Sequence, residues 1–421
     1  MKKFIFVCAA FALCASASAQ KGNLKKIENL TYGVTQLNTL EPEKWAEINQ
    51  LVNEAKENPE TAENCKTWEW ILKCKANDRF NMLKEYQANN NQFSDMKAFF
   101  LNEKAIVDAA EKYNKLIQTP DAKGKLPYKD KELEIQKLWL KENASASRGN
   151  LYVGATQYVY NEPQVAVDLL ETYYASFDSP IFEGDNLKNT DKNYKESAFV
   201  YATALKGINA DPAKIEEWDI KSLETQNGAL ACQELITAYK QKGDTANEQK
   251  YLQYGYENFK QTNIFGINLA QNAINNHEYD KTLQICDELI KRQEDGSTPI
   301  ADEEGKPYEN VWYPYYFKAV SLFNTEKYDQ AYEAFVNGDE KCPGHLELVM
   351  GAGTSAAKYG NNHFADKTVC KPWFEKALKY FNKAEENWPE ASDQWGYQTY
   401  VCYNNLDNQV MKEKYKKYAE K

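Results

Sequence analysis

Histidine, glycine and proline are scarce in this chain of 421 residues, which has 3, 19 and 13 of them. Three histidines leave little general acid–base chemistry, because histidine is the side chain that most often performs it. The sequence also has no HExxH, Walker, GxSxG or GxGxxG motif. It therefore favours a protein without catalysis, no catalytic residue is assigned, and an enzyme with an unrecognised site is the least supported alternative.

Long apolar runs are absent after the first 19 residues, so no later segment could span a bilayer. The chain begins MKKFIFVCAAFALCASASAQ, with two lysines, an apolar run and the small residues Ala17, Ser18 and Ala19. This pattern predicts a signal peptide over residues 1–19. A membrane anchor is the alternative, but the run is shorter than the roughly 20 residues that a span requires. We expect an exported protein of the periplasm or cell envelope, without membrane insertion.

Positive charge is also in deficit. The formal net charge is −11, and losing Lys2 and Lys3 with the signal peptide changes it from −11 to −13. An acidic chain argues against nucleic acid as a partner. Seven cysteines remain after residue 19, an odd number. Cys65 and Cys74 fall on opposite faces of one expected helix, so most cysteines are interpreted as small core residues.

What the sequence does contain is a helical pattern that recurs. Residues 326–343 read EKYDQAYEAFVNGDEKCP, and residues 374–389 read FEKALKYFNKAEENWP. Both place a small residue, an aromatic residue four positions later, another small residue three positions after that, and a proline beyond. On a helix the first three positions share one stripe, and the proline ends the helix. With Ala331 as the reference, equivalent anchor positions are Ala166, Lys214, Glu248, Thr282, Ala377 and Met411.

The spacing of these anchors indicates repeats with insertions. Three of the six intervals equal 34 residues, and the others are longer by 14, 15 and 12. The extra residues coincide with polar segments near 178–193, 294–309 and 359–370, which have the composition of loops. A small residue also lies twelve positions before several anchors, at Gly154, Ala202, Ala270 and Ala319, with Gly353 in the corresponding place. Gly243 and Gly360 fall where the two helices of a pair would turn.

Residues 147–421 therefore resemble about seven tetratricopeptide repeats. The resemblance implies an all-α fold, a right-handed superhelical solenoid of antiparallel helix pairs. The region 20–146 is less regular. We expect it to hold degenerate repeats. Within 40–74 one helix should end before Pro59 and a second should carry Trp68, Ile71 and Leu72, followed by a helix over 94–118 and a loop over 119–131.

Two metal sites were considered and neither is expected. Cys342 and His345 precede a predicted helix, and His363 and Cys370 follow it. A helix of about 14 residues would hold the two pairs about 20 Å apart, too far for one zinc ion. The acidic segment PIADEEGKPYE lacks the alternating ligands of a calcium loop. No metal and no cofactor are predicted.

The expected ligand surface follows from the resemblance, since such solenoids bind ligands on the concave face formed by the first helix of each pair. That face would carry amide and aromatic side chains and few lysines, Lys240 and Lys358 among them. We therefore expect a protein or peptide partner, with a glycan as the alternative ligand and a plain solvated face as the third interpretation. The candidate binding residues are Gln233, Gln271, Asn275, Tyr313, Tyr316, Phe323, Asn324, Tyr400, Tyr403 and Asn404.

Overall fold

The computed structural model describes residues 22–121 and 123–420, so the expected signal peptide lies outside the described residues. In these ranges the protein is all-α, apart from one isolated β-bridge between Ala301 and Pro307. The chain divides into two compact units, Met1–Ala231 and Cys232–Lys421, and the boundary falls within α10 (Gly228–Lys242). Each unit is described separately.

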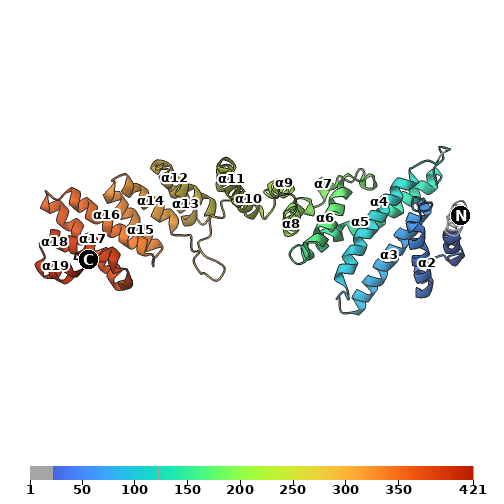
Figure 1. Cartoon of the computed structure of the whole chain (residues 1–421), viewed down its shortest axis with the longest axis horizontal. Helices are drawn as coiled ribbons and strands as arrows, with labels where there is room; N and C mark the ends of the chain where they lie inside the picture. Colours follow the sequence, from blue (N-terminus) through green and yellow to red (C-terminus); the bar gives the residue numbers. More distant parts are fainter. Residues whose placement is uncertain (1–21, 122, 421) are drawn as a thin grey trace, which may run out of the picture. The chain divides into compact units, whose positions relative to one another are not determined.

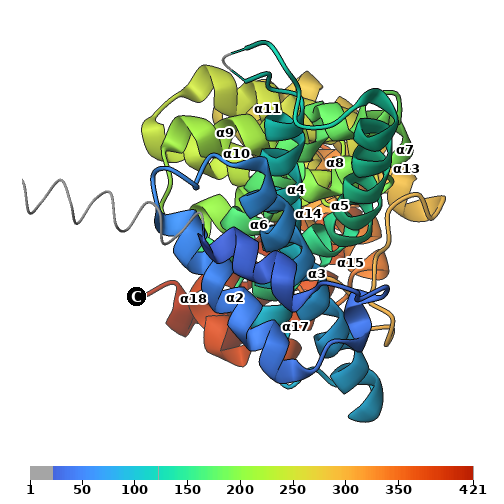
Figure 2. The same cartoon turned by 90° about the vertical axis from the view of Figure 1, so that its right-hand side faces the viewer.

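The N-terminal unit begins with a helix over residues 22–30 and continues with helices in antiparallel succession (Figures 1 and 2). In order they are η1 (Leu37–Thr39), α2 (Pro42–Glu57), α3 (Cys65–Ala88), α4 (Met96–Ile117), α5 (Asp130–Tyr158), α6 (Pro163–Ala175), η2 (Ser176–Asp178), η3 (Pro180–Phe182), α7 (Leu187–Thr190), α8 (Asn193–Gly207) and α9 (Pro212–Ser222). The predicted helix over 94–118 corresponds to α4, and the predicted loop over 119–131 ends where α5 begins. Neighbouring helices contact one another from α2 to α6, and α6 then contacts α8.

The first polar segment, 178–193, is built into the core of this unit. Ile181 and Phe182 are 6% and 5% exposed and pack in the same cluster as α3, α4 and α5. Asp191 receives hydrogen bonds from Arg148 Nη1 at 2.5 Å and from the Tyr173 hydroxyl at 2.8 Å. Burial opposes ionisation of Asp191, but these bonds and the backbone N–H of Asn193 outweigh it and lower the pKa of the carboxyl. A composition typical of loops therefore conceals a segment with its own apolar anchors.

The C-terminal unit consists of helix pairs stacked in series. Its elements after α10 are α11 (Thr245–Asn258), α12 (Ile264–Asn275), α13 (Tyr279–Glu294), α14 (Tyr313–Asn324), α15 (Tyr328–Lys341), α16 (Leu346–Asn362), α17 (Lys367–Asn387), η4 (Pro389–Ala391), α18 (Ser392–Asn405), α19 (Gln409–Tyr415) and η5 (Lys416–Tyr418). Each helix contacts the next, and α12, α14, α16 and α18 also contact one another in that order. The predicted fold class, an all-α solenoid of antiparallel helix pairs, is confirmed.

The anchor positions lie where the repeat pattern places them in the core. Ala166, Thr282, Ala331 and Ala377 are 0% exposed. The three anchors that are not small, Lys214, Glu248 and Met411, are half-buried. Among the small residues expected on the partner helices, Ala202, Ala270 and Ala319 are also 0% exposed. Helices α15 and α17 end two residues before Pro343 and Pro389, as the proline positions predict.

One turn recurs between the two helices of a pair. Its central residue has a positive φ at Asn209, Gly243, His277, Glu326 and Asp407. After each of them, the next backbone N–H bonds to the carbonyl five residues earlier, for example Glu278 N to Ala273 O at 2.8 Å and Lys327 N to Leu322 O at 3.0 Å. This is the hydrogen-bond pattern of a Schellman motif, which satisfies the last carbonyls of the first helix. The pair structure therefore repeats in the backbone even where the side chains differ.

The loop expected at 359–370 is instead mostly helix. Helix α16 continues to Asn362 and α17 begins at Lys367, so only 363–366 connect them. The Asp366 side chain caps α17 by accepting from the Thr368 N–H at 2.9 Å, which starts the helix ahead of Pro372. Gly360, expected at the turn, lies inside α16 and faces Phe374. The extra residues of this repeat lengthen its two helices.

The segment 294–309 does leave the helical framework, as a projecting connection between α13 and α14 (Figure 1). Its tip is a short hairpin in which the Tyr308 N–H bonds to Ile300 O at 3.0 Å and the Asp302 N–H to Lys306 O at 3.0 Å. Its base is fixed, because Thr298 is 3% exposed and its hydroxyl donates to Lys260 O at 2.5 Å. Only the tip lacks packing against the repeats.

No helix in the described part of the chain is both long and apolar enough to cross a membrane.

Candidate functional site

The ten predicted binding residues lie on alternate helices of the C-terminal unit. By helix they are Gln233 on α10, Gln271 and Asn275 on α12, Tyr313, Tyr316, Phe323 and Asn324 on α14, and Tyr400, Tyr403 and Asn404 on α18. These are the first helices of their pairs. Helix α12 contacts α14, and α14 and α18 each contact α16, so one helix lies between the residues of α12 and α14 and those of α18.

The densest part of the set is at the start of α14. Trp312, the N-cap residue of this helix, stacks on Tyr313 with ring centroids 4.5 Å apart, and on the other side meets the His345 ring at 4.4 Å. Tyr316 lies 5.3 Å from Trp312 and 6.2 Å from the core residue Phe335. Burial raises the pKa of Tyr316, so its hydroxyl remains a neutral donor and acceptor. The sequence analysis did not assign Trp312 or His345 to the binding surface. Trp312 directly precedes α14, and His345 directly precedes α16.

The amide side chains of the set differ in how far they are already engaged. Gln271 Nε2 donates to Asn275 Oδ1 at 3.0 Å, so one amide orients the other along α12. Asn324, at the end of α14, is exposed. Asn404 Nδ2 donates a long hydrogen bond of 3.5 Å to Asn405 Oδ1. These groups keep donors and acceptors for a ligand, because an amide offers two of each.

Tyr403 has little solvent-accessible surface that a ligand could contact. Its side chain is 8% exposed and stacks on Tyr415 of α19 at 5.5 Å, so it belongs to the contact between α18 and α19. Tyr400 is half-buried, and Tyr397, one turn earlier on α18, is 52% exposed. The rings of these two tyrosines lie 6.5 Å apart. The pair of Tyr397 and Tyr400 therefore presents the accessible aromatic surface of α18.

Besides Lys358, helix α16 supplies Met350 and Thr354, which the sequence analysis did not assign. Met350 and Thr354 are half-buried and Lys358 is exposed, at intervals of four along the helix, whereas Val349 and Ala352 are fully buried. Such spacing places the first three on one stripe, turned away from the core. Asn361, near the end of the helix, accepts a hydrogen bond from Asn405 of α18 at 3.0 Å. These residues lie between the α14 group and the α18 group.

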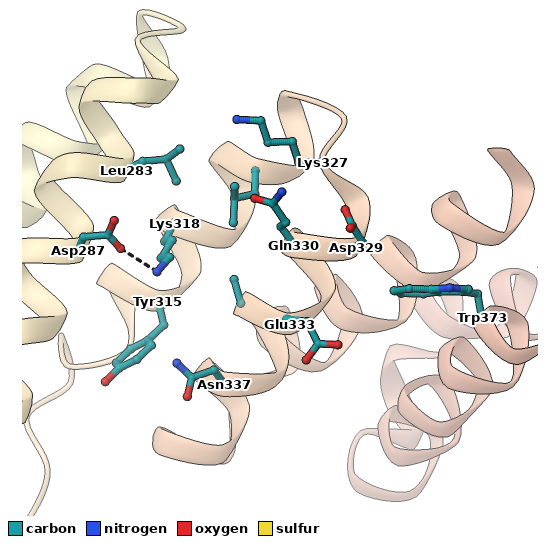
Figure 3. A pocket seen from close by; sticks show the side chains of 12 residues that line it. Leu283, Asp287, Tyr315, Lys318, Lys327, Asp329, Gln330, Glu333, Asn337 and Trp373 are labelled. Carbon is teal, nitrogen blue, oxygen red and sulfur yellow. Dashed lines mark ion pairs between the residues drawn. The ribbon is translucent and has the colours of Figure 1, made fainter. Parts of the chain in front are cut away.

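A cleft of about 730 Å³ lies on the side of the second helices (Figure 3). Leu283 and Asp287 of α13 form one wall, and α15 forms another. The Lys318 ammonium of α14 lies 2.7 Å from the Asp287 carboxylate, a half-exposed ion pair of the kind that contributes at most about 1 kcal/mol. Trp373 of α17 marks the far end (Figure 3).

The cleft is polar and of mixed charge. Glu333 and Asp329 of α15 face it with Gln330 and Asn337. The Lys376 ammonium lies 4.1 Å from the Trp373 ring centroid and 3.9 Å from Glu333, so it already occupies the aromatic end. Burial raises the pKa of Tyr315 in the floor to about 12, which keeps this phenol neutral. These groups can bind polar ligands.

The residues considered for zinc lie at opposite ends of α16, since His345 is its N-cap and His363 its C-cap residue. His345 stacks on Trp312, and His363 Nδ1 is 2.9 Å from Tyr359 O. In the ranges the structure describes, no group of three or more His, Cys, Asp or Glu side chains is arranged to hold a metal ion. Five of the seven cysteines there are buried and all are free.

No family model matches the sequence, and no curated protein matches it. Among solved structures, the crystal structure of yeast Tom70 aligns over 98% of this chain and 92% of its own, with 13% identity and a TM-score of 0.32. A circular tandem repeat protein with novel repeat topology aligns over 90% of this chain and 81% of its own, with 11% identity and a TM-score of 0.20. Both scores are too low to support an inference, so function is argued from the residues and their geometry.

Proposed function

We propose that this protein is a binding scaffold without catalysis, and that its C-terminal unit binds an extended segment of a protein partner along α12, α14, α16 and α18. The observation that carries the proposal is the row of uncharged side chains on helices that contact one another in series. Gln271 and Asn275, then Tyr313 and Tyr316, offer amide and aromatic groups beside each other. An extended peptide presents unpaired N–H and C=O groups, and amide side chains complement both.

The expected site of action is the cell envelope, since the sequence begins with a signal-peptide pattern. A peptide ligand is favoured over a charged small molecule because the stripe of α16 that is turned away from the core carries one cation. This is Lys358, which lies between Thr354 and Asn361. Tyrosine side chains suit such contacts, as they give a large contact area with little loss of side-chain entropy.

A glycan is the second candidate ligand. The specific observation in its favour is the exposed face of Tyr397 beside Tyr400 and the neighbouring amide of Asn404. Aromatic faces next to amides can also bind sugar rings, so the experiment has to separate the two ligand classes.

The test measures binding of the wild-type protein to an array of unstructured peptides and to a glycan array. The double variant Tyr313→Ala, Tyr400→Ala should lose peptide binding at least tenfold, because truncated anchor residues typically cost about 2 kcal/mol. Tyr403 is left unchanged because its burial would confound the result. The control is Lys281→Ala with Glu413→Ala, both on second helices and 56% and 73% exposed.

Equal loss of peptide binding in both double variants would place the binding surface elsewhere, with the cleft of Figure 3 as the next site to examine. Glycan binding without peptide binding would replace the protein partner by a glycan. An enzymatic change in any arrayed ligand would contradict the absence of catalysis.

A further inference from the structure

A groove of about 420 Å³ lies along α3 in the N-terminal unit, far in sequence from the site proposed above. We call it the α3 groove. Leu37 of η1 and Trp45 of α2 form one side, Trp139 of α5 forms the other, and Arg79, Phe80 and Leu83 of α3 lie along it. Apart from one asparagine of η1 and polar side chains of α3, its surface is apolar.

The apolar residues of the groove are more exposed than they would be if another helix covered them. Phe80 is 50% exposed and Leu83 is 38% exposed. Together with Lys73 and Ala76 they recur every three or four residues, the spacing of a helix face that packs against a neighbour. Helix α2 has 16 residues and α3 has 24, so α2 is shorter by about 12 Å and covers only part of α3.

Trp45 and Arg79 contribute hydrogen-bond donors to the groove. Trp45 is 7% exposed, and its indole Nε1 has no hydrogen-bond partner within the described part of the chain. A buried donor without a partner costs about 1–3 kcal/mol. Arg79 donates to Ser147 Oγ at 2.9 Å and to Asn143 Oδ1 at 3.3 Å, and among the described residues it forms no ion pair with a carboxylate.

The charge of the groove is opposite to that of the chain. Its charged residues are Lys73 and Arg79, and no acidic residue lines it, although the chain has a formal net charge of −11. Lys73 is already paired with Glu69 at 2.6 Å. Arg79 acts on the buried Glu103 carboxyl through its charge but forms no ion pair with it. It remains a cation beside Phe80, in an apolar setting where a carboxylate would be bound more strongly than in water.

We propose that the α3 groove is a second docking surface, which binds an acidic amphipathic helix of a partner protein. From Lys73 to Leu83 the groove follows α3 for ten residues, or about 15 Å, which matches about three turns of a helix. A bound helix satisfies its own backbone hydrogen bonds, whereas an extended segment would need partners that the helical walls do not supply. Its apolar side chains would cover Phe80 and Leu83, and a carboxylate would face Arg79.

A second copy of the chain is a poorer occupant. In a symmetric dimer the same groove residues would contact one another, and no carboxylate lines the groove to meet Arg79. The partner helix avoids this because it supplies the negative charge itself.

The test uses a library of random peptides of about 16 residues, enough for four helical turns, displayed on phage and selected on the whole protein. Peptides that also bind the variant Phe80→Glu, Leu83→Glu are removed. The remaining peptides should carry apolar residues at i, i+3 or i+4, and i+7, with an excess of Asp and Glu. Synthetic copies should bind the wild type at least ten times more tightly than this variant, and rising salt should weaken them.

The control variant is Val153→Glu, Val410→Glu, which adds the same two charges at apolar residues 44% and 81% exposed and outside the groove. It should bind the selected peptides like the wild type, and circular dichroism should show that both variants fold. Selected peptides that lack helical periodicity, or that are basic, would overturn the proposal, as would a selection that retains none. A wild-type dimer in sedimentation that is lost only in Phe80→Glu, Leu83→Glu would assign the groove to a second copy instead.

Discussion

Replacing Gly353 by alanine tests how closely α16 and α17 approach, because two opposing effects can be compared. Gly353 lies inside α16, where alanine is favoured over glycine by about 1 kcal/mol. A Cβ there would lie 2.5 Å from Cε1 and 2.7 Å from Cδ1 of Phe381, which is 0% exposed and has no free space to enter. Overpacking of this kind costs about 1–3 kcal/mol. We expect a net loss of about 1 kcal/mol.

Gly149 gives the matched control with the opposite sign. It lies inside α5, is exposed, and an added Cβ would have no atom within 4 Å. Gly149→Ala should therefore gain the helix-propensity term of up to about 1 kcal/mol without a packing cost. The two variants should shift the unfolding midpoint in opposite directions, by about 2–4 °C per kcal/mol for a unit of this size.

The measurement is thermal and urea unfolding followed by circular dichroism at 222 nm. If Gly353→Ala stabilises the protein as much as Gly149→Ala, the close contact between α16 and Phe381 is wrong. Adding Phe381→Leu to Gly353→Ala should recover part of the loss, since the smaller side chain makes room for the methyl group. Purely additive effects of the two substitutions would contradict their contact.

Three further predictions follow from the core, the projecting hairpin and the buried ion pair. Ala331→Trp or Ala377→Trp should cost about 3 kcal/mol or more, since both anchors are 0% exposed, and an unchanged melting midpoint would refute the register. Replacing 301–307 by Asn-Gly should leave the melting curve nearly unchanged. Deleting 296–306 also removes Thr298 and its bond to Lys260 O, so it should lower the melting midpoint. An equal lowering of the midpoint by both changes would show that the tip is structural. Asp191→Asn should cost about 3 kcal/mol, because it leaves Arg148 buried without a counter-ion. The pKa of Asp191 is lowered in the fold, so its contribution to stability is present above the unfolded pKa of about 4 and is lost as the pH falls below that value. Acid stability of the variant identical to that of the wild type would contradict this.

The fold class was predictable because the repeat signal depends on side chains that pack between helices. Ala331, Phe335 and Gly338 are all buried, so their spacing carries the geometry of the contact. Composition led to a wrong prediction where the burial of a segment depends on packing against distant parts of the chain. The polar segment at 178–193 contains Ile181 and Phe182, whose burial depends on helices more than 30 residues earlier in the chain.

The candidate site was predictable by helix but not by side chain. The repeat phase assigned the ten residues to the first helices, yet it could not show that Tyr403 turns toward Tyr415. Apart from Lys358 it named no ligand-facing residue on α16, because interpreting 359–370 as a loop obscured where α16 and α17 meet. The cap residue Asp366 followed by Thr368 was the available signal.

One turn is shared by five helix pairs, at Asn209, Gly243, His277, Glu326 and Asp407. It explains how the repeats of this chain can differ in length. Because a backbone conformation and two hydrogen bonds define the joint, five different residue types can occupy it. Residues added elsewhere, as the buried segment 178–193 or the projecting hairpin, leave the joint as it is. The lengthened helices α16 and α17 are instead connected by 363–366 without a positive φ. Intervals of 34, 48 and 49 residues can therefore coexist in one array. An ancestral duplication could diverge in size, repeat by repeat, without losing the pairing of its helices.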